Sequence, residues 1–212
     1  MYEHYPFIWG KKDKPTKPKA GIAGVVDTAP MTVETFDNHV YYYASVDSDR
    51  GLALMRAVRE KDHQLRAEQL SRGLDGVPLT PIWLHIHSFG GDLFAGLSLA
   101  DQLATIKSPL YAIVEGICAS AATLLSLSCT RRYILPSSYM LVHQLTSFVW
   151  GTHEQFKDEM ALQQMLMDRL VQFYVSKTKI KEPDAIKQML TRDFWMDAEK
   201  CVELGFADEI LR

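Results

Sequence analysis

The stretch PIWLHIHSFGGDLFAGLSLADQLATIKSPLYAIVEG (Pro81–Gly116) decides the fold class of this chain. It predicts a strand up to Ser88, the pair Gly90-Gly91, and a helix with one apolar face that Ser108-Pro109 ends. The nearly continuous apolar run that starts at Leu110 is typical of a strand buried on both faces. Strands that alternate with helices in this way favour an α/β fold with a largely parallel sheet.

The same alternation continues on both sides of this stretch. The further predicted elements are a strand over Val40–Val46, a helix that starts at Asp47–Arg50 and fades into the polar stretch Lys61–Pro78, a small-residue helix over ICASAATLLSLS (Ile117–Ser128), two short strands in YIL and YMLVH around Pro136-Ser137-Ser138, a long helix, and a last αβ unit within Thr191–Ile210. Thr152 and Gln155 have the spacing of a capping box at the start of the long helix. Its apolar stripe favours packing over a cofactor surface; the stripe comprises Phe156, Met160, Met167, Leu170, Val171 and Tyr174.

Length and composition indicate one globular domain. The chain has 212 residues, 47% of them hydrophobic, and a net charge of −3, which gives no broad basic surface for nucleic acid. Residues 1–30, with KKDKPTKPK (Lys11–Lys19), predict an N-terminal arm that is flexible in part, and residues 31–212 predict a single domain. An odd number of widely spaced cysteines, no long apolar span and no secretory-type start predict a cytoplasmic protein that does not contact membranes.

Three places in the sequence could carry chemistry. Ser120 lies at a predicted strand-to-helix junction, where a serine is commonly an N-cap but where backbone amides can also stabilise an oxyanion. Gly90-Gly91 lets the backbone approach a ligand closely, although paired glycines also simply form turns. His143 ends an apolar strand, where a histidine is more commonly structural than a general base. Each place is ambiguous when it is taken alone.

Metal and nucleotide sites are not predicted. His85 and His87 form an HxH pair on one strand face, but no third ligand with suitable spacing accompanies them, so neither a metal nor another cofactor is expected. The sequence contains no GxxxxGK[ST] motif, so energy from ATP would have to come from a separate protein.

Taken together, four ordered motifs resemble one family, the proteolytic subunit ClpP of the Clp protease. The motifs are SFGGDLFAG (Ser88–Gly96), GICASA (Gly116–Ala121), LPSSYMLVHQ (Leu135–Gln144) and TRDFWMDAEKCVELGFADEI (Thr191–Ile210). The resemblance implies a ClpP/crotonase-like fold of repeated β-β-α units with a protruding helix-strand handle. The sequence departs from the family pattern at Phe89, which stands where the family has proline, and in Lys61–Pro78, which resembles an insertion.

The resemblance also implies roles for individual residues. Ser120 would be the nucleophile, His143 the general base and Asp193 the carboxylate that orients it, a set that makes chemical sense because serine needs a neighbouring base. The resemblance implies backbone donors to the oxyanion at Gly91 and Ala121, an inter-ring contact between Arg192 and Glu154, and partner docking at Trp83 and His85. It further implies heptameric rings stacked in pairs, a partner AAA+ unfoldase ATPase, and unfolded polypeptides as substrates.

Four other interpretations can be set against this one. The chain could be a catalytically modified ring or scaffold subunit of a mixed Clp complex, or a ClpP-like phage capsid-maturation peptidase. A signal-peptide-type peptidase would be marked by a serine–lysine dyad, whereas His143 and Asp193 are both present. A crotonase-type acyl-CoA enzyme would share the fold but has no use for a Ser-His-Asp set.

Overall fold

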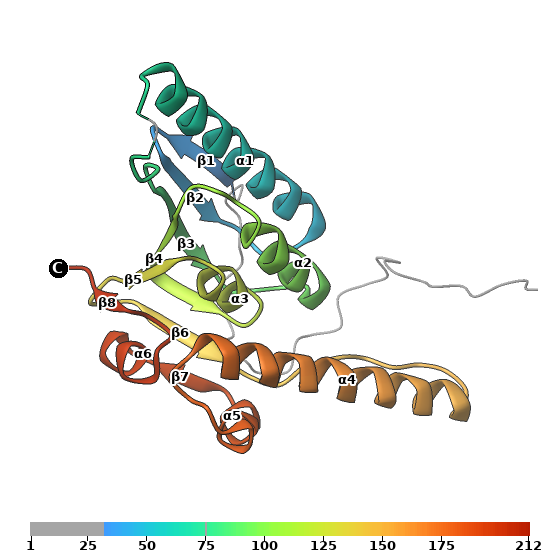
Figure 1. Ribbon diagram of the computed structural model, residues 1–212. Helices are drawn as coiled ribbons and strands as arrows, with labels where there is room; N and C mark the ends of the chain where they lie inside the picture. The colour runs from blue at the N-terminus through green and yellow to red at the C-terminus, as the bar shows by residue number, and fades with distance from the viewer. Residues whose placement is uncertain (1–31, 75) are drawn as a thin grey trace, which may run out of the picture. The chain divides into compact units, whose positions relative to one another are not determined.

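The computed structural model describes residues 32–74 and 76–212 as alternating strands and helices (Figure 1). The strands are β1 (Thr32–Phe36), β2 (His39–Tyr43), β3 (Ile82–Ser88), β4 (Leu110–Ala119), β5 (Arg131–Ile134), β6 (Tyr139–Val142), β7 (Phe194–Met196) and β8 (Glu209–Ile210). The helices are α1 (Ser48–Ser71), α2 (Leu93–Leu103), α3 (Ala122–Leu127), α4 (His153–Lys177), α5 (Pro183–Leu190) and α6 (Ala198–Leu204). The arm predicted for residues 1–30 lies outside the described residues, so the domain division stays a prediction.

The strands form one mixed sheet that is largely parallel. Its order is β1-β2-β3-β4-β5-β8, while β6 pairs with β4 and β7 pairs with β6. The pairs β1–β2 and β6–β7 are antiparallel, and the other pairs are parallel. The predicted α/β class and the largely parallel sheet are therefore confirmed.

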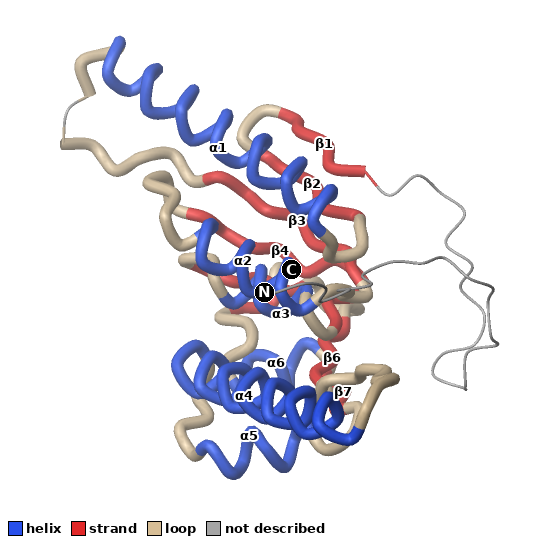
Figure 2. The backbone as a smooth tube through the Cα atoms, turned by 90° about the vertical axis from the view of Figure 1, so that its right-hand side faces the viewer, coloured by secondary structure: helices blue, strands red, loops and turns tan. Residues whose placement is uncertain are grey.

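Helices α1, α2 and α3 lie along one face of this sheet (Figure 2). Side chains alternate between the two faces of a strand, and the residues that face the helices are fully buried. These are Val40 and Tyr42 on β2, Leu84 and Ile86 on β3, and Ala112 and Val114 on β4. This apolar layer fixes the register of the parallel strands, because a slip by one residue would turn every side chain to the other face.

Two elements near the N-terminal end differ from the sequence prediction. Strand β1 was not predicted; it forms a hairpin with β2 around Asp37, which has a left-handed φ of 49°. Helix α1 does not fade after Lys61 but continues to Ser71. Apart from the buried Asp62, its second half is mostly polar and exposed, and i,i+4 ion pairs support it, including the pair of Arg72 with Glu68.

The element after β4 also begins later than the sequence predicts. The segment predicted as a helix from Ile117 is first the end of β4, which pairs with β6 from Ile117 to Ala119. Helix α3 starts only at Ala122. Gly116, with φ of 77°, lets the strand bend and resume, so small residues that could form a helix remain in the sheet.

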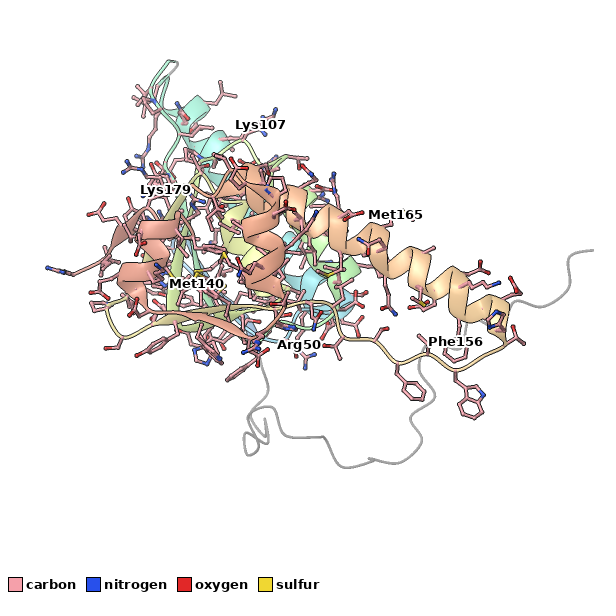
Figure 3. All side chains as sticks on the ribbon, turned by 90° about the horizontal axis from the view of Figure 1, so that it is seen from below. Arg50, Lys107, Met140, Phe156, Met165 and Lys179 are labelled. Atoms are coloured by element: carbon pink, nitrogen blue, oxygen red, sulfur yellow. The ribbon has the colours of Figure 1, made fainter. Side chains whose placement is uncertain are left out.

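Helix α4 extends away from the sheet, together with the segment that precedes it (Figures 1 and 3). We call residues 144–165 the handle. The capping box is confirmed: the Thr152 hydroxyl accepts from the Gln155 amide, and the Gln155 side chain accepts from the Thr152 amide at 2.8 Å. Of the stripe, Leu170, Val171 and Tyr174 pack in the core of the chain, whereas Phe156 and Met160 are exposed on the handle and do not pack against the core of the described chain. No helix within the described ranges has both the length and the apolar composition that a membrane crossing requires.

Candidate active site

Ser120 lies on a tight turn between β4 and α3. Its φ of 54° is left-handed, a conformation that costs a side-chain-bearing residue roughly 1–2 kcal/mol. Hydrogen bonds hold the turn from both sides: the Ser120 amide donates to Leu141 O at 2.8 Å, and Ser120 O accepts from the amide and the hydroxyl of Thr123. The N-cap of α3 is Ala121, so the N-cap interpretation of Ser120 is wrong. The turn instead presents a half-buried serine hydroxyl without a hydrogen-bond partner in the described part of the chain.

The pair Gly90-Gly91 lies directly against this turn. Gly90 has φ of 89°, and a Cβ added to it would lie 2.7 Å from Ser120 Cβ and 3.0 Å from Ala121 N. Gly91 has φ of 152°, and its added Cβ would lie 2.2 Å from Val46 O. Glycine is therefore required at both positions, because a side chain at Gly90 would collide with the serine turn and one at Gly91 would collide with Val46.

Two backbone amides beside Ser120 are available to a ligand. Val46 clamps the glycine loop, since its amide donates to Gly90 O at 2.9 Å and its carbonyl accepts from the Asp92 amide at 2.7 Å. The Gly91 amide takes no part in these bonds. Within residues 32–74 and 76–212, neither the Gly91 amide nor the Ala121 amide donates a hydrogen bond. Two free donors next to a serine hydroxyl can stabilise a developing oxyanion.

The sheet register brings His143 and Asp193 to the same place. In the antiparallel pair β6–β7, Val142 lies opposite Phe194, so the next residues outward are His143 and Asp193. Strand β6 also lies beside β4, and Leu141 O binds the Ser120 amide. Three segments far apart in the sequence therefore end at one corner of the sheet, as the resemblance implies.

Within the described residues of the single chain, no hydrogen bond joins the side chains of Ser120, His143 and Asp193. His143 Nδ1 donates instead to Gln144 O at 2.6 Å, and Asp193 is exposed. Because a carbonyl can only accept, the His143 proton lies on Nδ1 and the Nε2 lone pair is free. That tautomer is the one that a general base for a serine requires.

The order of the four motifs agrees with a comparison against known families. The sequence profile of the family described as Clp protease matches residues 35–212. The chain belongs to the Clp protease family. The chain is similar to the ATP-dependent Clp protease proteolytic subunit of Streptococcus mutans, at 35% identity over 133 residues that cover 61% of this chain and 68% of the relative. The predicted ClpP family and fold are confirmed.

Two further Clp protease subunits show the same range of similarity. Proteolytic subunit 1 of Protochlamydia amoebophila is 34% identical over 140 residues, which cover 63% of this chain and 66% of the relative. Proteolytic subunit 2 of Treponema denticola is 31% identical over 134 residues, with 62% and 66% covered. These relatives support a ClpP-type peptidase, and the roles of single residues remain proposals.

The remaining predicted site residues are Arg192, Glu154, Trp83 and His85. Arg192 and Glu154 are both exposed, and within the chain Glu154 pairs with Lys157 at 3.0 Å. Trp83 is half-buried and His85 is buried, both on the sheet face opposite α1. No group of three or more metal-ligating side chains occurs in the part of the chain that the structure describes.

One polar cluster was missed by the sequence analysis. His85 is hydrogen-bonded to His39 and to Glu115, and Tyr43 also donates to Glu115. These residues come from three strands, and only the alternation of β2, β3 and β4 could have indicated that their side chains share a face. The HxH pair is therefore not a matched pair of ligands, because His87 Nδ1 binds Glu115 O instead.

Proposed function

We propose that this chain is the serine endopeptidase subunit of a self-compartmentalising Clp protease. The observation that carries the proposal is the strained turn at Ser120, placed between the two unused amides of Gly91 and Ala121. The strained backbone conformation of this serine costs stability, which a purely structural residue would not need to do. Together with the two free amides, it suits acyl transfer.

The reaction would proceed through an acyl-enzyme. Ser120 Oγ attacks the scissile carbonyl while His143 Nε2 accepts its proton, and the Gly91 and Ala121 amides bind the oxyanion. His143 then gives the proton to the leaving amine, and water repeats the sequence to release the acid. Asp193 stabilises the positive charge on His143 once the ring exchanges Gln144 O for its carboxylate.

Assembly and partners are part of the same proposal. The handle exposes large apolar side chains, including Phe148 at 88% and Trp150 at 89%, which suits burial against other subunits. We expect heptameric rings stacked in pairs in the cytoplasm, with Arg192 facing Glu154 of the opposite ring. The relatives are named ATP-dependent, and this sequence carries no phosphate-binding loop, so a separate AAA+ unfoldase would deliver unfolded polypeptides at the face of Trp83 and His85.

One observation keeps a second function open. Since His143 is held by Gln144 rather than Asp193 in the single chain, a ring subunit that is silent by itself fits the same geometry. Such a subunit would be catalytically modified and would act as a scaffold in a mixed complex.

Covalent labelling separates the two functions. A fluorophosphonate probe should label Ser120 and no other serine, and Ser120→Ala should lower peptide hydrolysis by at least about 10³-fold. Ser137→Ala, at an exposed turn serine, is the matched control and should keep wild-type rate and labelling. Hydrolysis that survives Ser120→Ala unchanged would exclude the peptidase proposal, and an unlabelled but assembled wild-type chain would favour the scaffold.

A further inference from the structure

The sheet face opposite α1 carries an unusual set of rings. The aromatic and charged residues that point to this face are His39, Tyr41 and Tyr43 on β2, Trp83, His85 and His87 on β3, Tyr111 and Glu115 on β4, and Arg131 and Tyr133 on β5; Ile113 of β4 lies among them. Most of them contact a neighbouring ring; Trp83, for example, packs against Tyr111 with centroids 5.1 Å apart. We call this set the aromatic face.

A chain of hydrogen bonds crosses the aromatic face. His85 Nδ1 lies 2.6 Å from Glu115 Oε1, and His85 Nε2 lies 2.8 Å from His39 Nδ1. Tyr43 donates its hydroxyl to the second Glu115 oxygen. Burial, and then the bond to Glu115, raises the pKa of Tyr43, so the phenol keeps its proton. We call His39, His85, Glu115 and Tyr43 the relay.

The relay fixes the tautomer of each ring. The ionised Glu115 can only accept, so His85 Nδ1 carries a proton and its Nε2 must accept one from His39 Nδ1. The one imidazole lone pair of the relay that is left for a further proton is His39 Nε2. A proton taken up there can also be shared with His85 through their hydrogen bond. Tyr41 stacks on His85 at 4.3 Å and helps to bury it, so half-buried His39 is the ring that keeps contact with water.

The surroundings set the direction of the titration. Burial, and next the neighbouring His85, lower the pKa of His39 from its ordinary 6.5, while Asp37 and Glu115 act in the opposite direction. The other titratable or charged groups that share this face are Glu34 of β1, His87 of β3, Arg131 of β5 and the tyrosines already named. His39 is therefore neutral at neutral pH and gains its charge only in acidic solution.

We propose that the relay is a proton-operated switch on the docking of a hydrophobic loop of the proposed partner ATPase to the aromatic face, an inference that rests on the proposed function. With His39 neutral, the rings form an apolar floor that a loop can cover. With His39 protonated, a loop that covers the floor must remove water from a cation stacked on Trp83, with ring centroids 6.1 Å apart. Docking is thus favoured at neutral pH and opposed by acid.

The sign and the size of the effect follow from proton linkage. Because docking favours the neutral ring, the docked state has the lower His39 pKa, and the affinity is fully present above the pKa of free His39. Below that pKa one proton must leave for each loop that docks, so the affinity falls by up to about tenfold per pH unit. The loss stops once the pH passes below the pKa of the docked state.

Two measurements test the switch in the full, assembled chain. The first is the Trp83 emission between about pH 5 and about pH 8, with Trp83→Phe as the subtraction blank, because an imidazolium stacked on an indole quenches it. The second is the affinity of a capped, uncharged peptide of Leu, Gly and Phe residues, followed by fluorescence anisotropy over the same range. Peptide hydrolysis is not used as a readout, since the proposed reaction itself transfers protons through His143.

Matched variants decide the outcome. His39→Gln keeps an N–H for His85 but cannot titrate, so the emission change should disappear and the peptide affinity should become flat with pH; His39→Asn is a second variant in case the first fails to fold. His63→Gln, at an exposed histidine of α1, should keep the wild-type profiles. A wild-type affinity that is flat with pH, a profile that His39→Gln leaves unchanged, or no peptide binding at any pH would overturn the switch. None of these results touches the labelling of Ser120, so failure of the switch and failure of the peptidase proposal are distinguishable.

Discussion

Replacing Gly90 by alanine tests how closely the glycine loop borders the reacting serine. The new Cβ would lie 2.6 Å from Ala119 O and 2.7 Å from Ser120 Cβ, whereas ordinary contact begins at 3.4 Å. The loop and the serine turn must therefore separate by about 0.8 Å, because packed atoms do not overlap. A misplacement of about 1 Å can lower a rate about 10²-fold, so we expect kcat for a short peptide to fall by about that factor.

Gly76→Ala is the matched control for this change. Gly76 has φ of 83°, close to the 89° of Gly90, but an added Cβ would meet nothing within 4 Å. Both variants therefore carry the left-handed backbone cost of roughly 1–2 kcal/mol, and Gly90→Ala adds about 1–3 kcal/mol of overpacking. Urea unfolding measures these losses, and peptide hydrolysis and fluorophosphonate labelling measure the site.

The expected pattern is a slow Gly90→Ala enzyme that labels slowly and a Gly76→Ala enzyme with wild-type kcat. A folded Gly90→Ala protein with wild-type kcat would refute the argument, because it would mean that the loop can move away without disturbing the serine or the Ala121 amide. Equal loss of kcat in both variants would also refute it, since general destabilisation would then explain the effect.

Three further predictions concern assembly and partners. The chain alone should cleave short peptides but leave a stable folded protein intact, as gel analysis over hours would show, because the proposed sites face an enclosed chamber. A noncognate bacterial ATPase should couple weakly in a pull-down or degradation assay, since His85 brings a polar ring beside Trp83 on the aromatic face; tight, productive coupling would contradict this. Arg192→Glu should split double rings into single rings and lower activity together, and Glu154→Arg in the same chain should partly restore both; an intact, fully active Arg192→Glu double ring on native mass spectrometry would exclude the contact.

Much of the candidate site could be predicted from local sequence. The glycine pair after a strand, the serine after the next strand and the histidine after a third are each visible as short motifs, and their order supports the family. The helix start at Thr152 was equally predictable, because a capping box depends only on residues three positions apart. These features are local, so the identity and the spacing of neighbouring residues are enough to determine them.

Other features depend on what each segment packs against. The segment after Gly116 could form a helix by its small residues, yet it remains a strand as far as Ala119 because β6 pairs with it. The apolar stripe of α4 is continuous in sequence, but only its second half meets the core, and Met160 is 70% exposed. Periodicity indicates an apolar face without telling whether a partner within the same chain covers it.

The sequence by itself determined the fold class, the order of the motifs and the residue types available for catalysis. Only the tertiary structure decided that Ser120 is left-handed rather than an N-cap, that His143 rests on Gln144, and that His39 meets His85. The physical reason is that a backbone conformation at a turn and a hydrogen bond between strands depend on register, and register is set by the burial of many side chains on the other face of the sheet.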